Sequence, residues 1–187
     1  MAPLRVTLCS SNRGKLTEVR DTFPDWEIEL LVASTYPEED GETYLDNARI
    51  KARHGRSSGP SDRWMLADDS GIELAALGGN PGVHTARWAE GEHVEKTLAA
   101  LEGDEDRRAR YVAELVLLSP DRQELTGRGT LGGTIALEPS GQGGFGFDPV
   151  FVPDGERQTV AQLGERWKAQ HSHRALAAQA LRAALGS

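Results

Sequence analysis

The chain has little cysteine, no long apolar run and no excess of positive charge. Cys9 is the single cysteine among 187 residues, so no disulfide can form within one chain, and we expect it to be a core residue. No apolar segment is long enough to span a bilayer, and no charged start followed by an apolar run marks a signal peptide. The formal net charge of -8 argues against a general nucleic-acid binder, whose surface would be basic. These absences favour a cytoplasmic protein that binds neither nucleic acid nor membrane.

Several common catalytic motifs are also missing. The chain has no Walker phosphate-binding pattern, no Cys/His cluster with zinc spacing and no G-x-S-x-G elbow of a serine hydrolase. Residues 127–132 and 141–146 match the dinucleotide pattern G-x-G-x-x-G, but neither segment follows a strand and opens a helix. We interpret both as chance matches.

The residues that are present predict one globular domain of the α/β class. The apolar fraction is 38% and the charged fraction 27%, which is enough for a buried core in one large domain or in two lobes that share a sheet. Strands and helices alternate at first and strands cluster later, which favours a mixed sheet. The patterning predicts strands over 4–9, 26–32, 64–67, 72–77, 111–118 and 125–137, and helices over 15–23, 43–54, 93–101, 159–167 and 172–185.

The most informative segment carries two adjacent acids. Asp68 and Asp69 follow the apolar run 64–67 and precede Ser70 and Gly71, which predict a turn. Carboxylates at the end of a buried strand are costly unless a cation meets them. A hard divalent ion such as Mg²⁺ is the usual partner, and such an ion commonly acts on a phosphate. Taken alone, the pattern fits an ordinary acidic turn equally well.

Two further segments supply cations and a possible third carboxylate. The polar turn 10–15 lies between an expected strand and an expected helix, where backbone N–H groups and Lys15 can hold a phosphate. Lys51 lies one helical turn after Asn47, so both side chains project together. The acidic loop 38–40 precedes that helix and could supply another metal ligand. Each feature also has a non-functional explanation: the turn 10–15 fits an ordinary loop, and Lys51 and the acidic loop fit a solvated surface.

Two segments near the C-terminus could recognise a flat base. Ser172 predicts a helix N-cap, and His173 and Arg174 follow it, although cations in a first turn oppose the helix dipole. The loop 144–149 places Phe145 and Phe147 among glycines, where neighbours would cover the two rings poorly. Each pattern also has an ordinary explanation. The helix can tolerate the small loss of stability that cations in its first turn cause, and the loop can simply cover the core.

In this order, the segments resemble the Ham1-like inosine/xanthosine triphosphate pyrophosphatases, enzymes that remove non-standard purine nucleotides. The resemblance also includes 43–48, 76–83, 86–87 and Lys168, and it covers nearly the whole chain. It implies an elongated mixed β-sheet with flanking helices, two lobes around a central cleft, and one domain over 1–187 that usually forms a homodimer. It also implies Mg²⁺-dependent hydrolysis of ITP, dITP or XTP to the monophosphate and pyrophosphate, with Mn²⁺ as a possible substitute.

The resemblance assigns a role to each matching residue. Asp69 is implied as general base and metal ligand, with Glu39 as a second ligand, and Asp68 and Lys51 belong to the catalytic group. The implied substrate-binding residues are Ser10, Ser11, Asn12, Arg13, Gly14, Lys15, Ser70, Phe145, Gly146, Phe147, Asp148, Lys168, His173 and Arg174.

Three positions depart from the family pattern. Asp46 stands where Glu is more common, and Phe147 stands where Tyr or Trp is common. The match around Glu39 is loose because Glu38, Asp40 and Glu42 are near. Neighbouring strand residues point to opposite faces, so equal roles for Asp68 and Asp69 are not expected unless the chain bends.

Three alternatives stay open on the sequence. A nucleotide-sensing module would bind without hydrolysis, a Maf-like pyrophosphatase would prefer pyrimidine or modified nucleotides, and a dead dimeric scaffold would do neither. Lys168, His173 and Arg174 would donate to the O6 carbonyl of the purine, and adenine carries an amino group there instead. This reasoning does not explain how GTP, which also has O6, would be rejected.

Overall fold

A computed structural model of the chain describes residues 3–10 and 14–186. The chain forms two compact units: residues 1–69, 113–129 and 176–187 make the first, and residues 70–112 and 130–175 make the second. Three long strands contribute residues to both units. No helix among the described residues has the length and apolar character needed to cross a membrane.

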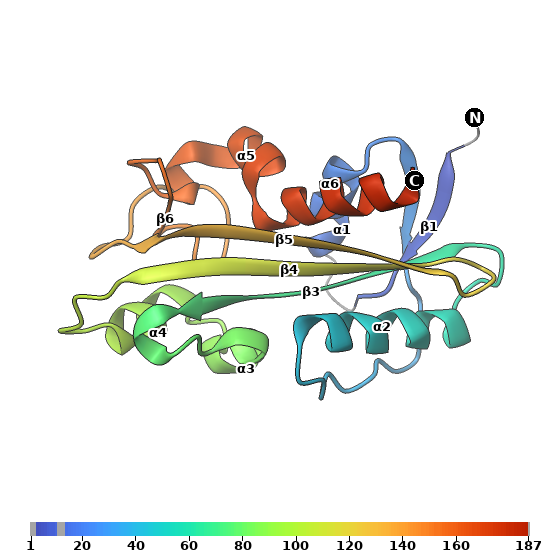
Figure 1. The fold of residues 1–187 in the computed structure, drawn as a ribbon, viewed down its shortest axis with the longest axis horizontal. Coiled ribbons are helices and arrows are strands. Elements are labelled where there is room, and N and C mark those ends of the chain that lie inside the picture. Colours follow the sequence, from blue (N-terminus) through green and yellow to red (C-terminus); the bar gives the residue numbers. More distant parts are fainter. Residues whose placement is uncertain (1–2, 11–13, 187) are drawn as a thin grey trace. The chain divides into compact units, whose positions relative to one another are not determined.

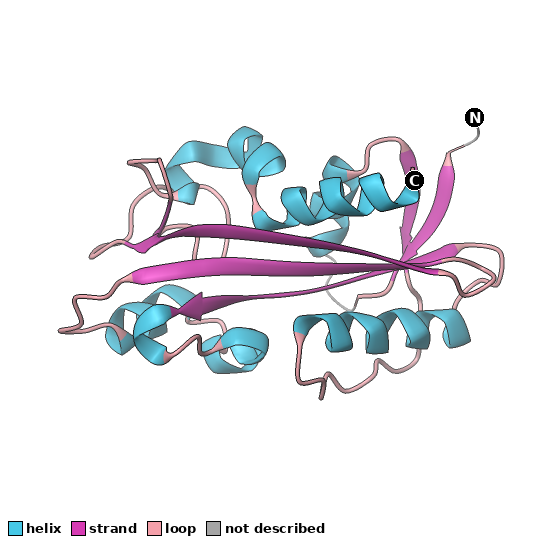
Figure 2. Cartoon of the chain, in the orientation of Figure 1, coloured by secondary structure: helices cyan, strands magenta, loops and turns pink. Residues whose placement is uncertain are grey.

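Six strands form one mixed sheet in the order β2-β1-β3-β4-β5-β6. Strand β1 pairs in parallel with β2 and β3, whereas β5 and β6 are antiparallel. The expected α/β fold with a mixed sheet is therefore confirmed (Figure 2). The strands are β1 (Leu4–Leu8), β2 (Trp26–Leu30), β3 (Trp64–Leu74), β4 (Arg108–Leu118), β5 (Glu124–Ile135) and β6 (Phe151–Pro153).

Strand β3 differs from the expectation of two short strands around an acidic turn. It is continuous through Asp68, Asp69 and Ser70, so the paired acids lie inside a strand and not at its end. The prediction of a turn was therefore wrong. Both aspartates are buried, at 2% and 7% exposure. Alternation along the strand sends the two carboxylates to opposite faces of the sheet.

Helices cover both faces of the sheet in the first unit (Figure 1). Helices α1 (Gly14–Thr22) and α6 (His173–Leu185) pack on one face, where their apolar side chains join Val6, Leu8 and Leu66. Helix α2 (Tyr44–Ser58) packs on the other face, where Ala48 and Ala52 join Met65 and Ala67. Side chains 65–67 therefore point alternately to the α2 face and to the α1 and α6 face, and the same alternation applies to residues 68 and 69.

Local chemistry explains where α2 begins and how closely it packs. Thr43 caps the helix, because its side chain accepts a hydrogen bond from the backbone N–H of Asp46 at 3.2 Å. Gly55 faces β1 so closely that an added Cβ would lie 2.1 Å from the Sγ atom of Cys9. This approach places the buried face of α2 directly over the strand that leads to Ser10.

The second unit has its own core and shorter helices. Ile72, Leu74, Phe147 and Phe151 are among the side chains of this core. Its helices are α3 (Thr85–Ala89), α4 (His93–Ala100) and α5 (Val160–His171), and 3-10 turns lie at Ala75–Leu77 and Gly82–His84. Ser172 then accepts a hydrogen bond from the N–H of Ala175 at 3.1 Å, which confirms the expected N-cap of α6.

Candidate active site

Helices α1 and α2 each contribute a lysine, and each lysine forms an ion pair with a different aspartate of β3. The Nζ atom of Lys15, in the first turn of α1, lies 2.9 Å from both carboxylate oxygens of Asp68. The Nζ atom of Lys51, on α2, lies 3.0 Å from Oδ1 of Asp69. Because α1 and α2 lie on opposite faces of the sheet, each lysine reaches the carboxylate that points to its own face. Two buried negative charges in consecutive positions are thereby compensated.

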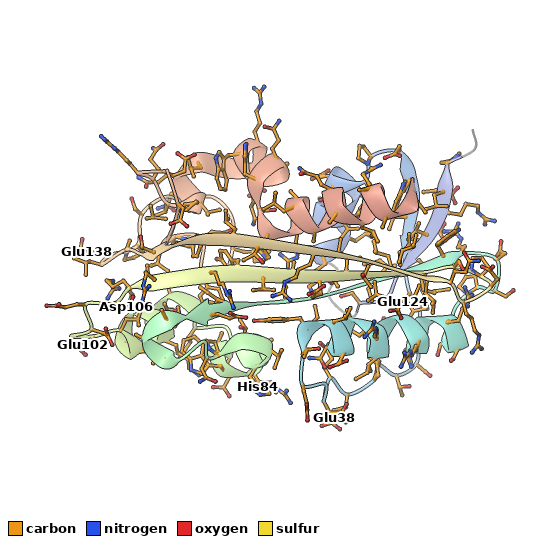
Figure 3. All side chains as sticks on the ribbon, in the orientation of Figure 1. Glu38, His84, Glu102, Asp106, Glu124 and Glu138 are labelled. Carbon is orange, nitrogen blue, oxygen red and sulfur yellow. The ribbon has the colours of Figure 1, made fainter. Side chains whose placement is uncertain are left out.

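Lys51 also holds the acidic loop that precedes α2. Its Nζ atom lies 2.7 Å from Oε2 of Glu39, so Glu39 and Asp69 converge on one ammonium group. Glu38 lies exposed on the same loop (Figure 3). Of the acids that the sequence left open, Glu39 is the one whose carboxylate is shown to share a cation with Asp69.

Asn47 fixes the second oxygen of Asp69 and the loop at the same time. Its Nδ2 atom donates to Oδ2 of Asp69 at 3.2 Å, and its Oδ1 atom accepts from the N–H of Gly41 at 2.8 Å. Asn47 is 1% exposed. The sequence placed Asn47 beside Lys51 but gave it no role, although the four-residue spacing was the signal that both reach one target.

Burial and charge together set the protonation of this cluster. Burial raises the pKa of Asp69 to about 6, although Lys51 and Asn47 act to lower it and the charge of Glu39 adds to the rise. Burial acts to lower the pKa of Lys51, but Asp68, Asp69 and Glu39 raise it overall. A charged lysine therefore faces a carboxylate that takes up a proton near neutral pH.

The carboxylates of Glu39 and Asp69 fit a magnesium ion that also binds phosphate. Magnesium is commonly held by one or two carboxylates together with substrate oxygens and water. Oε2 of Glu39 and Oδ1 of Asp69 lie 2.7 and 3.0 Å from the same Lys51 Nζ atom, so the two carboxylates are close enough to contribute ligands to one ion. Among residues 3–10 and 14–186, no three His, Cys, Asp or Glu side chains come together as a metal site.

The expected triphosphate loop is described only at its two ends. Ser10 is buried after β1, and Gly14 and Lys15 open α1. Ser11, Asn12 and Arg13 lie outside the described residues. The one cation of this loop that the structure describes is therefore Lys15, whose partner is Asp68.

A second cluster, in the second unit, is organised around Asp148. Its Oδ2 atom accepts from Lys168 Nζ at 2.8 Å and from the N–H of Phe145 at 2.9 Å. Asp148 and Lys168 are 4% and 6% exposed. Gly144 has a φ of +72°, and a Cβ there would lie 2.2 Å from the same Asp148 oxygen. The loop can wrap around this carboxylate only because residue 144 has no side chain.

The start of α6 adds two polar side chains to the second unit. The Nη2 atom of Arg174 donates to the hydroxyl of Ser70 at 2.9 Å. The imidazole of His173, which is 6% exposed, stacks on the ring of Tyr111. Four of the predicted base-binding residues, Ser70, Lys168, His173 and Arg174, therefore belong to one unit and come from distant parts of the chain.

The two phenylalanines of the glycine-rich loop behave differently. Phe145 is 58% exposed, and Lys168 Nζ lies 4.0 Å from the centre of its ring. Phe147 is 5% exposed and packs edge-on against His93 at 4.8 Å. The expectation that neighbours would leave both rings uncovered thus holds for Phe145 and is wrong for Phe147. Gly146 lies between them with a φ of +64°.

Comparison with known proteins gives consistent relatives over the whole chain. The family model described as the Ham1 family matches residues 6–184. A dITP/XTP pyrophosphatase of Deinococcus radiodurans is 41% identical over 98% of this chain and 94% of the relative. A dITP/XTP pyrophosphatase of Bdellovibrio bacteriovorus is 38% identical over 95% of both chains.

Solved structures give the same result. The Ham1 protein of Staphylococcus aureus superposes with a TM-score of 0.85 at 34% identity, over 97% of this chain and 98% of the other. A HAM1 protein of Coxiella burnetii gives a TM-score of 0.83 at 36% identity, over 98% of both chains.

Proposed function

Because this chain belongs to the Ham1 family, we propose that it hydrolyses non-standard purine nucleoside triphosphates, namely dITP, ITP and XTP, to the monophosphate and pyrophosphate. The relatives named dITP/XTP pyrophosphatase share 38–41% of its residues over nearly full length. The observation that carries the proposal is the pair of buried aspartates, each held by a lysine, in one strand. Such a group combines two ammonium groups that can bind phosphate oxygens with carboxylates that can hold a metal ion and accept a proton.

The first cluster would bind the triphosphate. Lys15 and Lys51 are bound to carboxylates in this structure, and we propose that both ammonium groups also contact phosphate oxygens when substrate binds. We assign Ser10, Gly14 and the loop residues 11–13 to the same end of the substrate. Glu39 and Asp69 would hold Mg²⁺, for which Mn²⁺ is a possible substitute. When bound, the ion neutralises charge on the phosphates and on the departing pyrophosphate.

Asp69 would act as the general base. Its pKa of about 6 allows it to be ionised at neutral pH and still accept a proton. The oxygen of a water molecule attacks the α-phosphorus, and Asp69 takes a proton from that water. The bond from the α-phosphorus to the bridging oxygen breaks, and pyrophosphate leaves with the bonding electrons. Asp68, whose partner is Lys15, would position that lysine.

The second cluster would bind the base. Lys168, His173 and Arg174 provide donors for the O6 carbonyl, and exposed Phe145 provides a ring that can stack on the purine. Ser70 and Asp148 hold Arg174 and Lys168 in place, and Gly146 and buried Phe147 support the loop. An adenine amino group facing these donors would leave buried polar groups without partners, which strongly disfavours ATP.

The resemblance to this family also suggests a cellular location, a domain organisation and an oligomeric state. We propose that the chain acts in the cytoplasm, as a single domain that forms a homodimer and has no nucleic-acid partner. A single cysteine and the acidic net charge of -8 support the first and last of these points.

Product analysis tests the proposed reaction. Purified protein is incubated with dITP and Mg²⁺, with dITP and Mn²⁺, and with dITP and EDTA, and the products are separated by ion-exchange chromatography. We expect equal amounts of dIMP and pyrophosphate with either metal and none with EDTA. Release of dIDP and orthophosphate would contradict the proposed site of attack, and binding without turnover would indicate a nucleotide sensor.

A further inference from the structure

Tyr111 contacts two different parts of the proposed base-binding cluster. It lies on β4 with 7% of its surface exposed, and the sequence predicted it only as an apolar strand residue. Its ring faces His173, and its hydroxyl faces Asp148. One side chain therefore joins two groups that lie 25 positions apart in the chain.

The first contact is a parallel stack. The ring centres of Tyr111 and His173 are 4.6 Å apart, and the two planes differ by 12°. The torsion that turns an imidazole about its Cβ–Cγ bond has broad minima, so its plane must be set by neighbouring groups. A parallel ring whose centre is 4.6 Å away does this, because rotation of the imidazole would drive its edge toward the tyrosine ring.

The second contact is a long hydrogen bond. The Tyr111 hydroxyl lies 3.5 Å from Oδ1 of Asp148, and the other oxygen of that carboxylate accepts from Lys168 and from the N–H of Phe145. The hydroxyl therefore helps to orient the carboxylate that holds the lysine. At this distance it contributes less than the stack does.

The position of Tyr111 itself is fixed by the core. Its ring lies 4.4 Å from that of Phe151, at an interplanar angle of 37°, and 6.2 Å from that of Phe147. Phe151 is fully buried. The core therefore fixes the ring of Tyr111, and Tyr111 in turn limits the movement of His173 and Asp148.

We propose that Tyr111 is a positioning residue for base recognition, which holds the His173 imidazole in one plane and thereby sets the preference for 6-oxo over 6-amino purines. The inference rests on the proposed function, because it concerns the same base-binding cluster. A donor in a fixed direction helps only a base that carries an acceptor there, so loss of the stack should weaken recognition of inosine and leave adenine nearly unaffected.

Three single variants test the inference. Tyr111→Leu removes both contacts, and Tyr111→Phe removes only the hydroxyl. Leu101→Ala is the control, because it loosens the same core without altering a ring that contacts Tyr111 or His173. An aromatic pair contributes about 0.5–1.5 kcal/mol, so Tyr111→Leu should lower kcat/KM for dITP by about two- to twelvefold. We expect kcat/KM for dATP to stay constant, so the dITP/dATP ratio falls. Tyr111→Phe should lower the dITP/dATP ratio by less than about twofold, and Leu101→Ala should lower the melting temperature without changing the ratio.

A double variant separates positioning from general loosening. If Tyr111 acts through His173, then in a His173→Ala background Tyr111→Leu should have no larger effect than Tyr111→Phe. A loss of the same size in both backgrounds would overturn the inference. So would an unchanged dITP/dATP ratio in Tyr111→Leu, or an equal fall of that ratio in Leu101→Ala.

Binding of the product keeps this test independent of turnover. IMP affinity is measured by calorimetry for the wild type, Tyr111→Leu and Tyr111→Phe. Weaker binding by Tyr111→Leu alone supports the inference, even if the wild type releases no pyrophosphate and the proposed function fails. Equal affinities, or no IMP binding by the wild type, would overturn the inference. If the wild type and Tyr111→Leu hydrolyse dITP equally well, the inference fails but the proposed function stands.

Discussion

Replacing Asp69 by asparagine should abolish turnover and at the same time stabilise the fold. The carboxylate is 7% exposed, and burial raises its pKa to about 6, from 3.8 for an ordinary aspartate. Asparagine has nearly the same shape but stays neutral and accepts no proton. We therefore expect a loss of nearly all pyrophosphate release, together with a higher free energy of unfolding at alkaline pH.

The magnitude follows from the pKa of Asp69. Between pH 3.8 and about 6 the folded protein keeps a proton that the unfolded chain releases, so the free energy of unfolding falls as the pH rises. Above about pH 7 this cost is fully present and amounts to about 3 kcal/mol, with the attraction of Lys51 already included. The asparagine amide offers one acceptor where Lys51 and Asn47 both donate, and we expect this to reduce the net gain to about 1–2 kcal/mol.

Urea titrations of both proteins in EDTA, at pH 4 and at pH 8, measure this gain. Asp69→Asn should be more stable at pH 8 by about 1–2 kcal/mol, and this difference from the wild type should be lower at pH 4 by about 2.5 kcal/mol. Asp68→Asn is the matched control, because Asp68 lies in the same strand with a different lysine partner. Equal pH profiles for Asp69→Asn and the wild type would refute the reasoning, and so would pyrophosphate release at the wild-type rate.

Three further outcomes follow from contacts in the first unit. Lys15→Met removes the partner of buried Asp68, so urea titration should show a loss of about 2 kcal/mol, and the KM for dITP should rise; unchanged stability would contradict the ion pair. Gly55→Ala should cost about 1–3 kcal/mol despite the better helix propensity of alanine, because its Cβ would meet Cys9 Sγ at 2.1 Å. Adding Cys9→Ala should restore most of that loss, and a Gly55→Ala protein that melts above the wild type would refute the clash. Burial raises the pKa of Cys9 to about 12, so Ellman's reagent at pH 8 should label it only in denaturant, and rapid labelling of folded protein would contradict this.

The strand β3 shows why sequence reasoning identified the acids but misplaced them. Asp-Ser-Gly is typical of turns, and two adjacent carboxylates disfavour the interior of a sheet. Here Lys15 and Lys51, 53 and 18 positions away, neutralise Asp68 and Asp69 from opposite faces, so the strand continues. This compensation is a tertiary contact that local sequence preferences do not contain.

Helix α2 shows what could be predicted and why. The helix expected over 43–54 and the four-residue spacing of Asn47 and Lys51 rest on local features. Both are confirmed, because Thr43 caps α2 and both side chains reach Asp69. The loop that carries Glu39 has no such periodicity, and the choice among its acids needed the contact with Lys51.

The contacts within the proposed base-binding cluster could be predicted even less, because they come from the fold. Phe147 looked uncovered because its sequence neighbours are small, but His93 and Tyr111 cover it from distant elements. Tyr111 itself reads as a strand residue, because a stack on His173, 62 positions away, leaves no mark on the pattern of β4.

The central claim is that this chain releases pyrophosphate from the non-standard purine triphosphates ITP, dITP and XTP in preference to the standard nucleotides. The most direct measurement is kcat/KM for pyrophosphate release, with Mg²⁺, from ITP, dITP, XTP, GTP, ATP, CTP and UTP in parallel. We expect high values for ITP, dITP and XTP and low values for ATP and GTP. Equal values for ATP and ITP, or a preference for CTP or UTP, would contradict the claim.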